Sequence, residues 1–77
     1  MKARVVVLPK QSILDPQGLA VRDAMQHYGV PNVQAVRVGK LIEIELSGPA
    51  TETELHAVCR DLLSNSVVEE YQLILEE

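Results

Sequence analysis

Two side chains that could do chemistry, His56 and Cys59, lie three residues apart in the second half of the chain. On a helix this spacing places both on one face, where an imidazole can activate a thiol or supply part of a metal site. The apolar spacing around them favours a simpler interpretation, in which Cys59 belongs to the core and His56 is its exposed neighbour. A single cysteine also excludes an internal disulfide and a cysteine-rich zinc site.

The remaining ionisable residues are arranged as ordinary surface charge. Glu43 and Glu45 alternate along a predicted strand, His27 complements a helix dipole, and the glutamate pairs at 69–70 and 76–77 favour solubility. The sequence has no glycine-rich phosphate loop, catalytic triad or paired-carboxylate pattern. We therefore predict no catalytic residue, no metal ligand and no cofactor in this chain.

The length and charge of the chain limit its function further. Its 77 residues predict one small domain, residues 1–77, with a net charge of −4. A domain of this size buries only about 60–65% of its unfolded surface, so we expect a homo-oligomer, either a dimer or a tetramer. The acidic charge, with two Tyr and no Phe or Trp, argues against nucleic acid and anionic membranes as partners. The apolar run at 5–8 is too short for a signal peptide or a membrane span, so we expect a cytoplasmic protein.

Hydrophobic spacing predicts the element order β-α-β-β-α-β. This order is typical of a ferredoxin-like α+β domain, in which two helices cover one face of a four-stranded antiparallel sheet. The expected elements are a strand over about 2–8, a helix between Asp15 and Gly29, strands over 33–38 and 41–46, a helix that begins with a capping box at 51–54, and a strand over 67–75.

The start of the first helix combines favourable residues with one costly residue. Asp15 suits the N-cap position, where its carboxylate accepts hydrogen bonds from the first turn, and Pro16 suits the first helical position. Gly18 instead costs roughly 0.5–1 kcal/mol relative to alanine. We infer that another chain approaches the helix closely here, and that Gly18→Ala makes the isolated protein more stable while it weakens assembly.

A two-residue hairpin is predicted at Gly39-Lys40, between the two central strands. Its turn places Val38 opposite Leu41 and Val36 opposite Glu43. The resulting outer sheet face is half apolar, and we expect Val36, Val38 and Leu41 to form a dimer face.

Two cations at the predicted hairpin turn and an asparagine after the second helix are further candidate site residues. Arg37 and Lys40 flank the predicted hairpin turn and place two positive charges at one tip of the sheet, either as a solvated tip or as a functional contact. Asn65 follows the second helix, where it suits a left-handed C-cap or a contact with a partner.

Three segments of the chain resemble the signature segments of the PurS family. They are Leu14–Gly18, Val36–Lys40 and Leu62–Tyr71, and they occur in order over essentially the whole chain. PurS is the small subunit of phosphoribosylformylglycinamidine synthase in de novo purine (IMP) biosynthesis. One departure is Asn65-Ser66, where the family usually has Asn-Pro.

The resemblance implies a non-catalytic subunit of an ATP-dependent, glutamine-using ligase. In that complex a glutaminase subunit releases ammonia, a large synthetase subunit uses ATP and Mg²⁺, and a PurS dimer joins the two and supports ammonia transfer. Our hypothesis is that the following residues contact the larger subunits: Asp15, Pro16, Gln17, Gly18, Arg37, Gly39, Lys40 and Asn65.

A second hypothesis is a small-molecule-sensing regulatory domain of the same topology, whose ligand would bind between subunits. Other functions of this fold lack their residues here. The central strands have no aromatic residues for RNA recognition, and the first loop has neither a Cys-x-x-Cys pair nor the glycines of an acylphosphatase.

Overall fold

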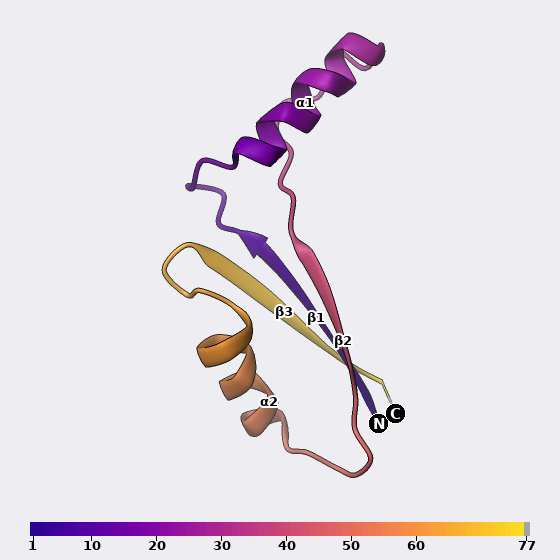
Figure 1. Cartoon of the computed structure of the whole chain (residues 1–77), viewed down its shortest axis with the longest axis vertical. Helices are drawn as coiled ribbons and strands as arrows, with labels where there is room; N and C mark the ends of the chain where they lie inside the picture. The colour runs from indigo at the N-terminus through magenta and orange to yellow at the C-terminus, as the bar shows by residue number, and fades with distance from the viewer. Residues whose placement is uncertain (77) are drawn as a thin grey trace.

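The structure is a computed structural model that describes residues 1–76, and its centre is a three-stranded antiparallel sheet in the order β2-β1-β3 (Figure 1). The α+β class and the antiparallel pairing are confirmed, and the expectation of a four-stranded sheet within one chain is wrong. The elements are β1 (Lys2–Pro9), α1 (Pro16–Tyr28), β2 (Lys40–Glu45), α2 (Glu52–Val58), a π-helical turn η1 (Cys59–Leu63) and β3 (Glu69–Glu76).

The core forms on one face of the central strand because its side chains alternate between the two faces. Ala3, Val5 and Val7 are at most 1% exposed, and Leu55 and Cys59 from the α2–η1 segment lie among the buried residues. Four partly buried residues of the outer strands pack against this cluster, and they are Ile42, Ile44, Tyr71 and Leu73. Each fully buried valine contributes about 1.5–3 kcal/mol, so β1 supplies much of the stability of the sheet.

The predicted capping box begins α2 and is confirmed. The Thr51 hydroxyl accepts a hydrogen bond from the Glu54 N–H at 3.1 Å, and the Glu54 carboxylate accepts one from the Thr51 N–H at 3.2 Å. The helix widens into the π-helical turn from Cys59 onwards. This turn ends at Ser64, whose hydroxyl donates to the Cys59 carbonyl at 2.7 Å.

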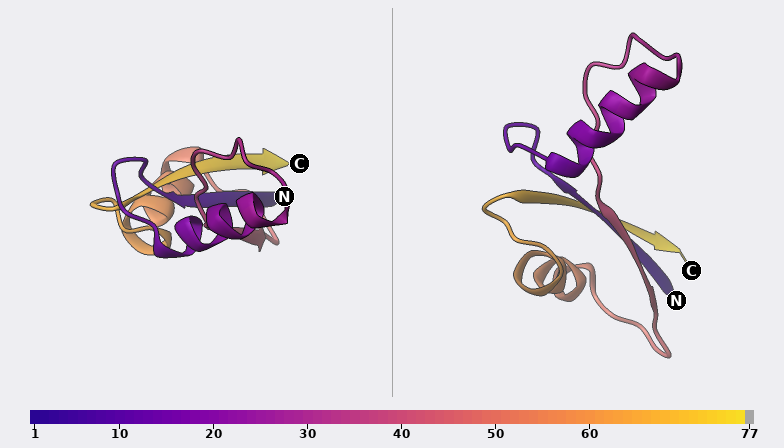
Figure 2. Two further views of the ribbon diagram at one scale, coloured as in Figure 1. Left: turned by 90° about the horizontal axis from the view of Figure 1, so that it is seen from above. Right: turned by 45° about the horizontal axis from the view of Figure 1, so that its top comes forward.

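Helix α1 differs from the expectation that two helices cover one sheet face. It extends beyond the end of the sheet, while α2 lies beside the strands (Figures 1 and 2). Its predicted end is confirmed, because Gly29 adopts a left-handed conformation with φ 119°. The only buried residue of α1 is Gly18, so no side chain of this helix enters the core of its own chain.

The predicted hairpin at Gly39-Lys40 is wrong. Residues 33–39, which we call the arm, form no strand pairing, and β2 begins at Lys40 and pairs with β1. The turn requires a positive φ at its first residue, and within residues 1–76 only Gly29 has one. The chain therefore runs straight through position 39, and Val38 does not pair with Leu41 of the same chain.

Candidate interaction site

The arm, the start of α1 and one end of the sheet meet at a junction that contains several of the predicted site residues. Asp15 occupies the N-cap position with extended backbone, but its side chain makes no capping hydrogen bond. Its Oδ2 atom instead accepts a hydrogen bond from the Val38 N–H at 2.8 Å. Asp15 therefore occupies the predicted N-cap position, but the hydrogen bond of its carboxylate goes to the arm, while the N–H groups of Gln17 and Gly18 are close enough to lower its pKa.

The structure explains why residue 18 is a glycine. A Cβ atom at this position would lie 2.0 Å from the Val36 carbonyl oxygen and 2.7 Å from Asp15 Oδ2. The close approach inferred from the sequence therefore comes from the protein's own arm. A contact between this helix end and a partner stays a prediction.

Gly39 lies where the backbone of the arm crosses close to β1, on the other side of the junction. A Cβ atom there would lie 2.1 Å from the Val7 carbonyl oxygen and 2.7 Å from Leu8 Cδ2. The glycine thus allows the arm to pass against β1 before β2 begins. The sequence indicated a special backbone position at Gly39, but the glycine is needed for close packing against β1 and not for a turn.

Arg37 ties the arm to the sheet. Its Nη1 atom donates to Glu70 Oε1 at 2.6 Å and to the Pro9 carbonyl at 3.2 Å, and its side chain is 29% exposed. The expectation of a solvated hairpin tip is therefore wrong for Arg37. Lys40 is exposed, and among residues 1–76 it forms no ion pair. Sequence reasoning missed Glu70, which looked like solubility charge and lies 33 residues from Arg37.

Asn65 shapes the loop that leads into β3. Its Oδ1 atom accepts from the Val67 N–H at 3.1 Å, and its carbonyl accepts from the N–H groups of Val68 and Glu69 at 3.0 and 2.7 Å. A left-handed C-cap at Asn65 is wrong, because no described residue other than glycine has a positive φ. The Lys10 N–H donates to the Val68 carbonyl at 2.9 Å, which fixes this loop at the same end of the sheet as the junction.

A groove of about 620 Å³ lies between the loop before α1, the first turns of α1 and the arm. Arg22 and Gln34 give it polar groups, and Ile13, Leu14 and Leu19 give it apolar ones. Leu14 is 73% exposed. The groove therefore offers an exposed, mixed surface of the kind found at protein contacts.

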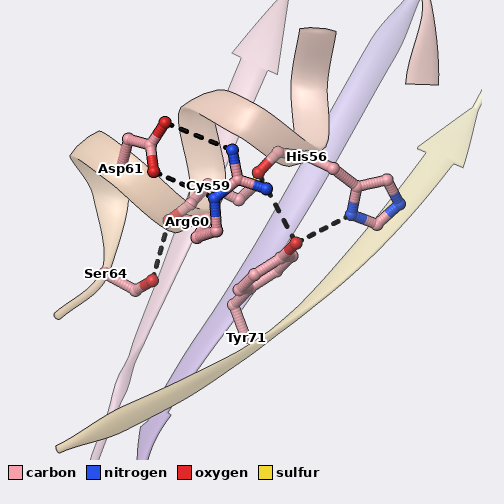
Figure 3. A network of polar contacts seen from close by, with 6 residues as sticks. All are labelled: His56, Cys59, Arg60, Asp61, Ser64 and Tyr71. Atoms are coloured by element: carbon pink, nitrogen blue, oxygen red, sulfur yellow. Dashed lines mark hydrogen bonds and ion pairs between the residues drawn. The ribbon is translucent and has the colours of Figure 1, made fainter. Parts of the chain in front are cut away.

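His56 and Cys59 have separate environments (Figure 3). His56 Nδ1 lies 2.9 Å from the Tyr71 hydroxyl, whereas Cys59 is 1% exposed and burial raises the pKa of its thiol. The interpretation of Cys59 as core and His56 as an exposed neighbour is confirmed. Within the described residues 1–76, no group of three His, Cys, Asp or Glu side chains is placed to hold a metal ion.

The charge on Asp15 makes the junction sensitive to acid. The Val38 N–H is the main cause that lowers the pKa of Asp15 below its ordinary value of 3.8; desolvation opposes it, and the nearby N–H groups of Gly18 and Gln17 lower it further. A lowered pKa stabilises the folded state fully above the ordinary value and progressively less as the pH falls through the lowered pKa. We expect the NMR shift of the Val38 amide proton to change in this acid range.

Asp15→Asn is the matched control, because its amide keeps an acceptor oxygen but loses the titrating charge. Its Val38 amide shift should stay constant over the same range. An equal response in both proteins would show that the shift reports a different titrating group.

The chain is a small α+β domain. The residues that stand out in its sequence hold the arm against α1 and the sheet. A family model, PurS: phosphoribosylformylglycinamidine (FGAM) synthase, matches residues 2–77. The PurS subunit of Bacillus subtilis is 41% identical over 78 residues, which cover 99% of this chain and 93% of that protein. The chain belongs to the PurS family, and it is an FGAM synthase subunit of purine biosynthesis.

Solved structures agree with this assignment. The C2 crystal form of Bacillus subtilis PurS has a TM-score of 0.81 at 41% identity and covers 99% of this chain and 98% of that one. A chain in the structure of PurLQS from Thermotoga maritima has a TM-score of 0.78 at 28% identity, with coverages of 95% and 93%. Within residues 1–76, no helix is both long and apolar enough to cross a membrane.

Proposed function

We propose that this chain is a non-catalytic connecting subunit of FGAM synthase. It joins a glutaminase subunit to a large ATP-dependent synthetase subunit and supports the transfer of ammonia between them. The observation that carries this proposal is the full-length match to PurS subunits, together with the similarity of this chain to one in the structure of PurLQS from Thermotoga maritima. The ATP and Mg²⁺ of the reaction belong to the large subunit, and the complex works in the cytoplasm.

The junction divides the proposed contact residues into two groups. Pro16, Gln17 and Lys40 are exposed, so they are available to touch a larger subunit directly. The others make hydrogen bonds or close backbone crossings within the chain, and so position the exposed group: Asp15, Gly18, Arg37, Gly39 and Asn65. The surface that we assign to the partners is therefore the groove together with the exposed first turn of α1 and Lys40.

Reconstitution of the complex tests the connecting role. We expect the tagged chain to retain a glutaminase and an ATP-dependent synthetase from its own organism. Omission of the chain should reduce FGAM formation with glutamine far more than with added ammonia, because ammonia bypasses the connection. Equal losses with both nitrogen donors would contradict the connecting role. A large thermal shift with an amino acid or nucleotide, without retention of either subunit, would favour the regulatory domain instead.

Lys40→Glu is expected to weaken assembly with the larger subunits while the isolated protein stays folded. Lys40 is exposed and free of ion pairs among the described residues, so its reversal costs the fold little. A rim charge acts mainly on encounter and orientation, so we expect about a 5–50-fold loss of affinity. The measurement is the dissociation constant by surface plasmon resonance, with circular dichroism as the folding check.

Arg60→Glu is the matched control for that variant. Arg60 is also exposed, and its guanidinium pairs only with the adjacent Asp61 at 2.9 Å, on the π-helical turn. The same change of charge there should leave the affinity close to that of the wild type. Equal losses from both variants would indicate a general charge effect and contradict a local role for Lys40.

A further inference from the structure

We propose that the loop before β3 modifies itself: Asn65 loses its side-chain nitrogen as ammonia and becomes aspartate or isoaspartate. Figure 1 shows this loop as the bend between the α2–η1 segment and β3. Asn65 and Ser66 are both exposed there. The turn that they begin supplies an attacking group, an unhindered leaving group and a donor for the developing charge, and water is the one further reactant.

The reaction is an intramolecular substitution at the carboxamide of Asn65. The backbone nitrogen of Ser66 attacks Cγ of Asn65, and the new C–N bond closes a succinimide ring. The bond between Cγ and Nδ2 breaks, and Nδ2 leaves as ammonia with the proton of the Ser66 N–H. Water then opens the ring at either carbonyl, which gives aspartate or isoaspartate at position 65. Because the attacking and attacked atoms belong to adjacent residues, ring closure needs no second molecule.

The attacking group and the leaving group are both free of hydrogen bonds. Among residues 1–76, the Ser66 N–H has no acceptor, and the side-chain nitrogen of Asn65 has none either. The next three N–H groups differ, because those of Val67, Val68 and Glu69 all donate to oxygens of Asn65. Within this turn, the Ser66 N–H is therefore the group that can give up its proton without breaking a hydrogen bond.

The Val67 N–H is placed to stabilise the charge that develops during the attack. It donates to Asn65 Oδ1 at 3.1 Å, and this oxygen becomes negative when Cγ turns tetrahedral. A donor that is already in position at such a distance favours the charged state over the neutral amide. The same hydrogen bond is that of an Asx turn, which folds the carboxamide back over the following peptide. The side chain is thus held beside the nitrogen that attacks it.

Both products change the entry to β3. The Glu69 carboxylate accepts a hydrogen bond from the Asn65 N–H at 2.7 Å, so a carboxylate at position 65 lies near a like charge. Isoaspartate also adds a methylene to the backbone of a loop that is tied to the sheet through Lys10 and Val68. Conversion therefore loosens this loop and makes the net charge of −4 more negative.

Incubation of the unaltered protein at mildly alkaline pH, followed by peptide mass spectrometry, tests the reaction. We expect a mass increase of about 1 Da at position 65, where OH replaces NH₂, with isoaspartate in the product and an equal amount of free ammonia. Asn32 is the internal control, because the β-branched Val33 crowds the N–H that would attack, and we expect about tenfold slower conversion there. Equal rates at the two asparagines, or aspartate without isoaspartate, would overturn the proposal.

Two variants of Ser66 identify the attacking group. Ser66→Pro removes the N–H yet suits the fold, because residue 66 is the second position of the turn that the Val68 N–H closes on the Asn65 carbonyl. Conversion at Asn65 should stop in this variant. The matched control Ser66→Ala keeps the N–H and should convert like the wild type. Equal conversion in both variants would overturn the proposal. None of these results bears on retention of the larger subunits, so the connecting role is judged separately.

Discussion

Alanine in place of Gly18 is expected to destabilise the protein, which reverses the gain in stability expected from helix propensity alone. The propensity gain is at most about 1 kcal/mol. Against it, the new Cβ atom would lie 2.0 Å from the Val36 carbonyl oxygen, a backbone atom that cannot rotate away. Relieving such overpacking typically costs about 1–3 kcal/mol, and separating α1 from the arm also loses the hydrogen bond from Val38 to Asp15. We expect a melting temperature roughly 5–10 °C lower by calorimetry.

Gly48→Ala is the matched control for this loss. A Cβ atom at Gly48 meets nothing within 4 Å, and the backbone there has no positive φ. This variant should therefore stay within about 0.5 kcal/mol of the wild type. A Gly18→Ala protein as stable as the control would show that the arm does not hold its position against α1 in solution.

Alanine in place of Gly39 is expected to separate the arm from β1. The Cβ atom would lie 2.1 Å from the Val7 carbonyl oxygen, at the point where Val7 pairs with Lys40. Displacement of the arm should break the backbone hydrogen bonds between β1 and β2 that lie nearest Gly39. We expect a loss of about 1–3 kcal/mol in the free energy of unfolding. Amide exchange should accelerate at this end of β2.

The pairs at the far end of β2 give an internal comparison for that exchange measurement. Ala3 pairs with Ile44, well away from the crossing. The amide protection of this pair should fall only as far as the global stability falls. Uniform acceleration along the whole strand would mean that Gly39 acts on the entire fold. Unchanged exchange at Lys40 and Leu41 would contradict a close crossing in solution.

Elements that depend on local spacing could be predicted from the sequence. The β-branched run of β1, the glycine that ends α1 and the capping box at Thr51 and Glu54 each specify a conformation through near neighbours. The arm could not be predicted, because an alternating pattern indicates a strand but not which edge, or which chain, it pairs with. The same limit explains why a two-residue turn was expected at Gly39.

The sequence drew attention to residues that meet at the junction, but it did not predict the contacts that they make within the chain. Gly18 was identified because a glycine is costly in a first turn, whereas the atom that needs the space, the Val36 carbonyl, is 18 residues away. The ion pair of Arg37 with Glu70 joins residues 33 positions apart, and no local pattern marks it. Backbone crossings and long-range ion pairs depend on the folded path, so spacing alone does not reveal them.

The central position of β1 also determines when this chain folds during synthesis. β1 is made first, but one of its two neighbours is β3, which spans Glu69–Glu76 and is made last. Val5 and Val7 therefore stay only partly covered, by β2, until β3 has been made, because the pairing of β1 with β3 cannot begin earlier. Until then the new chain exposes an apolar, β-prone segment, which makes contact with a chaperone or an early partner valuable.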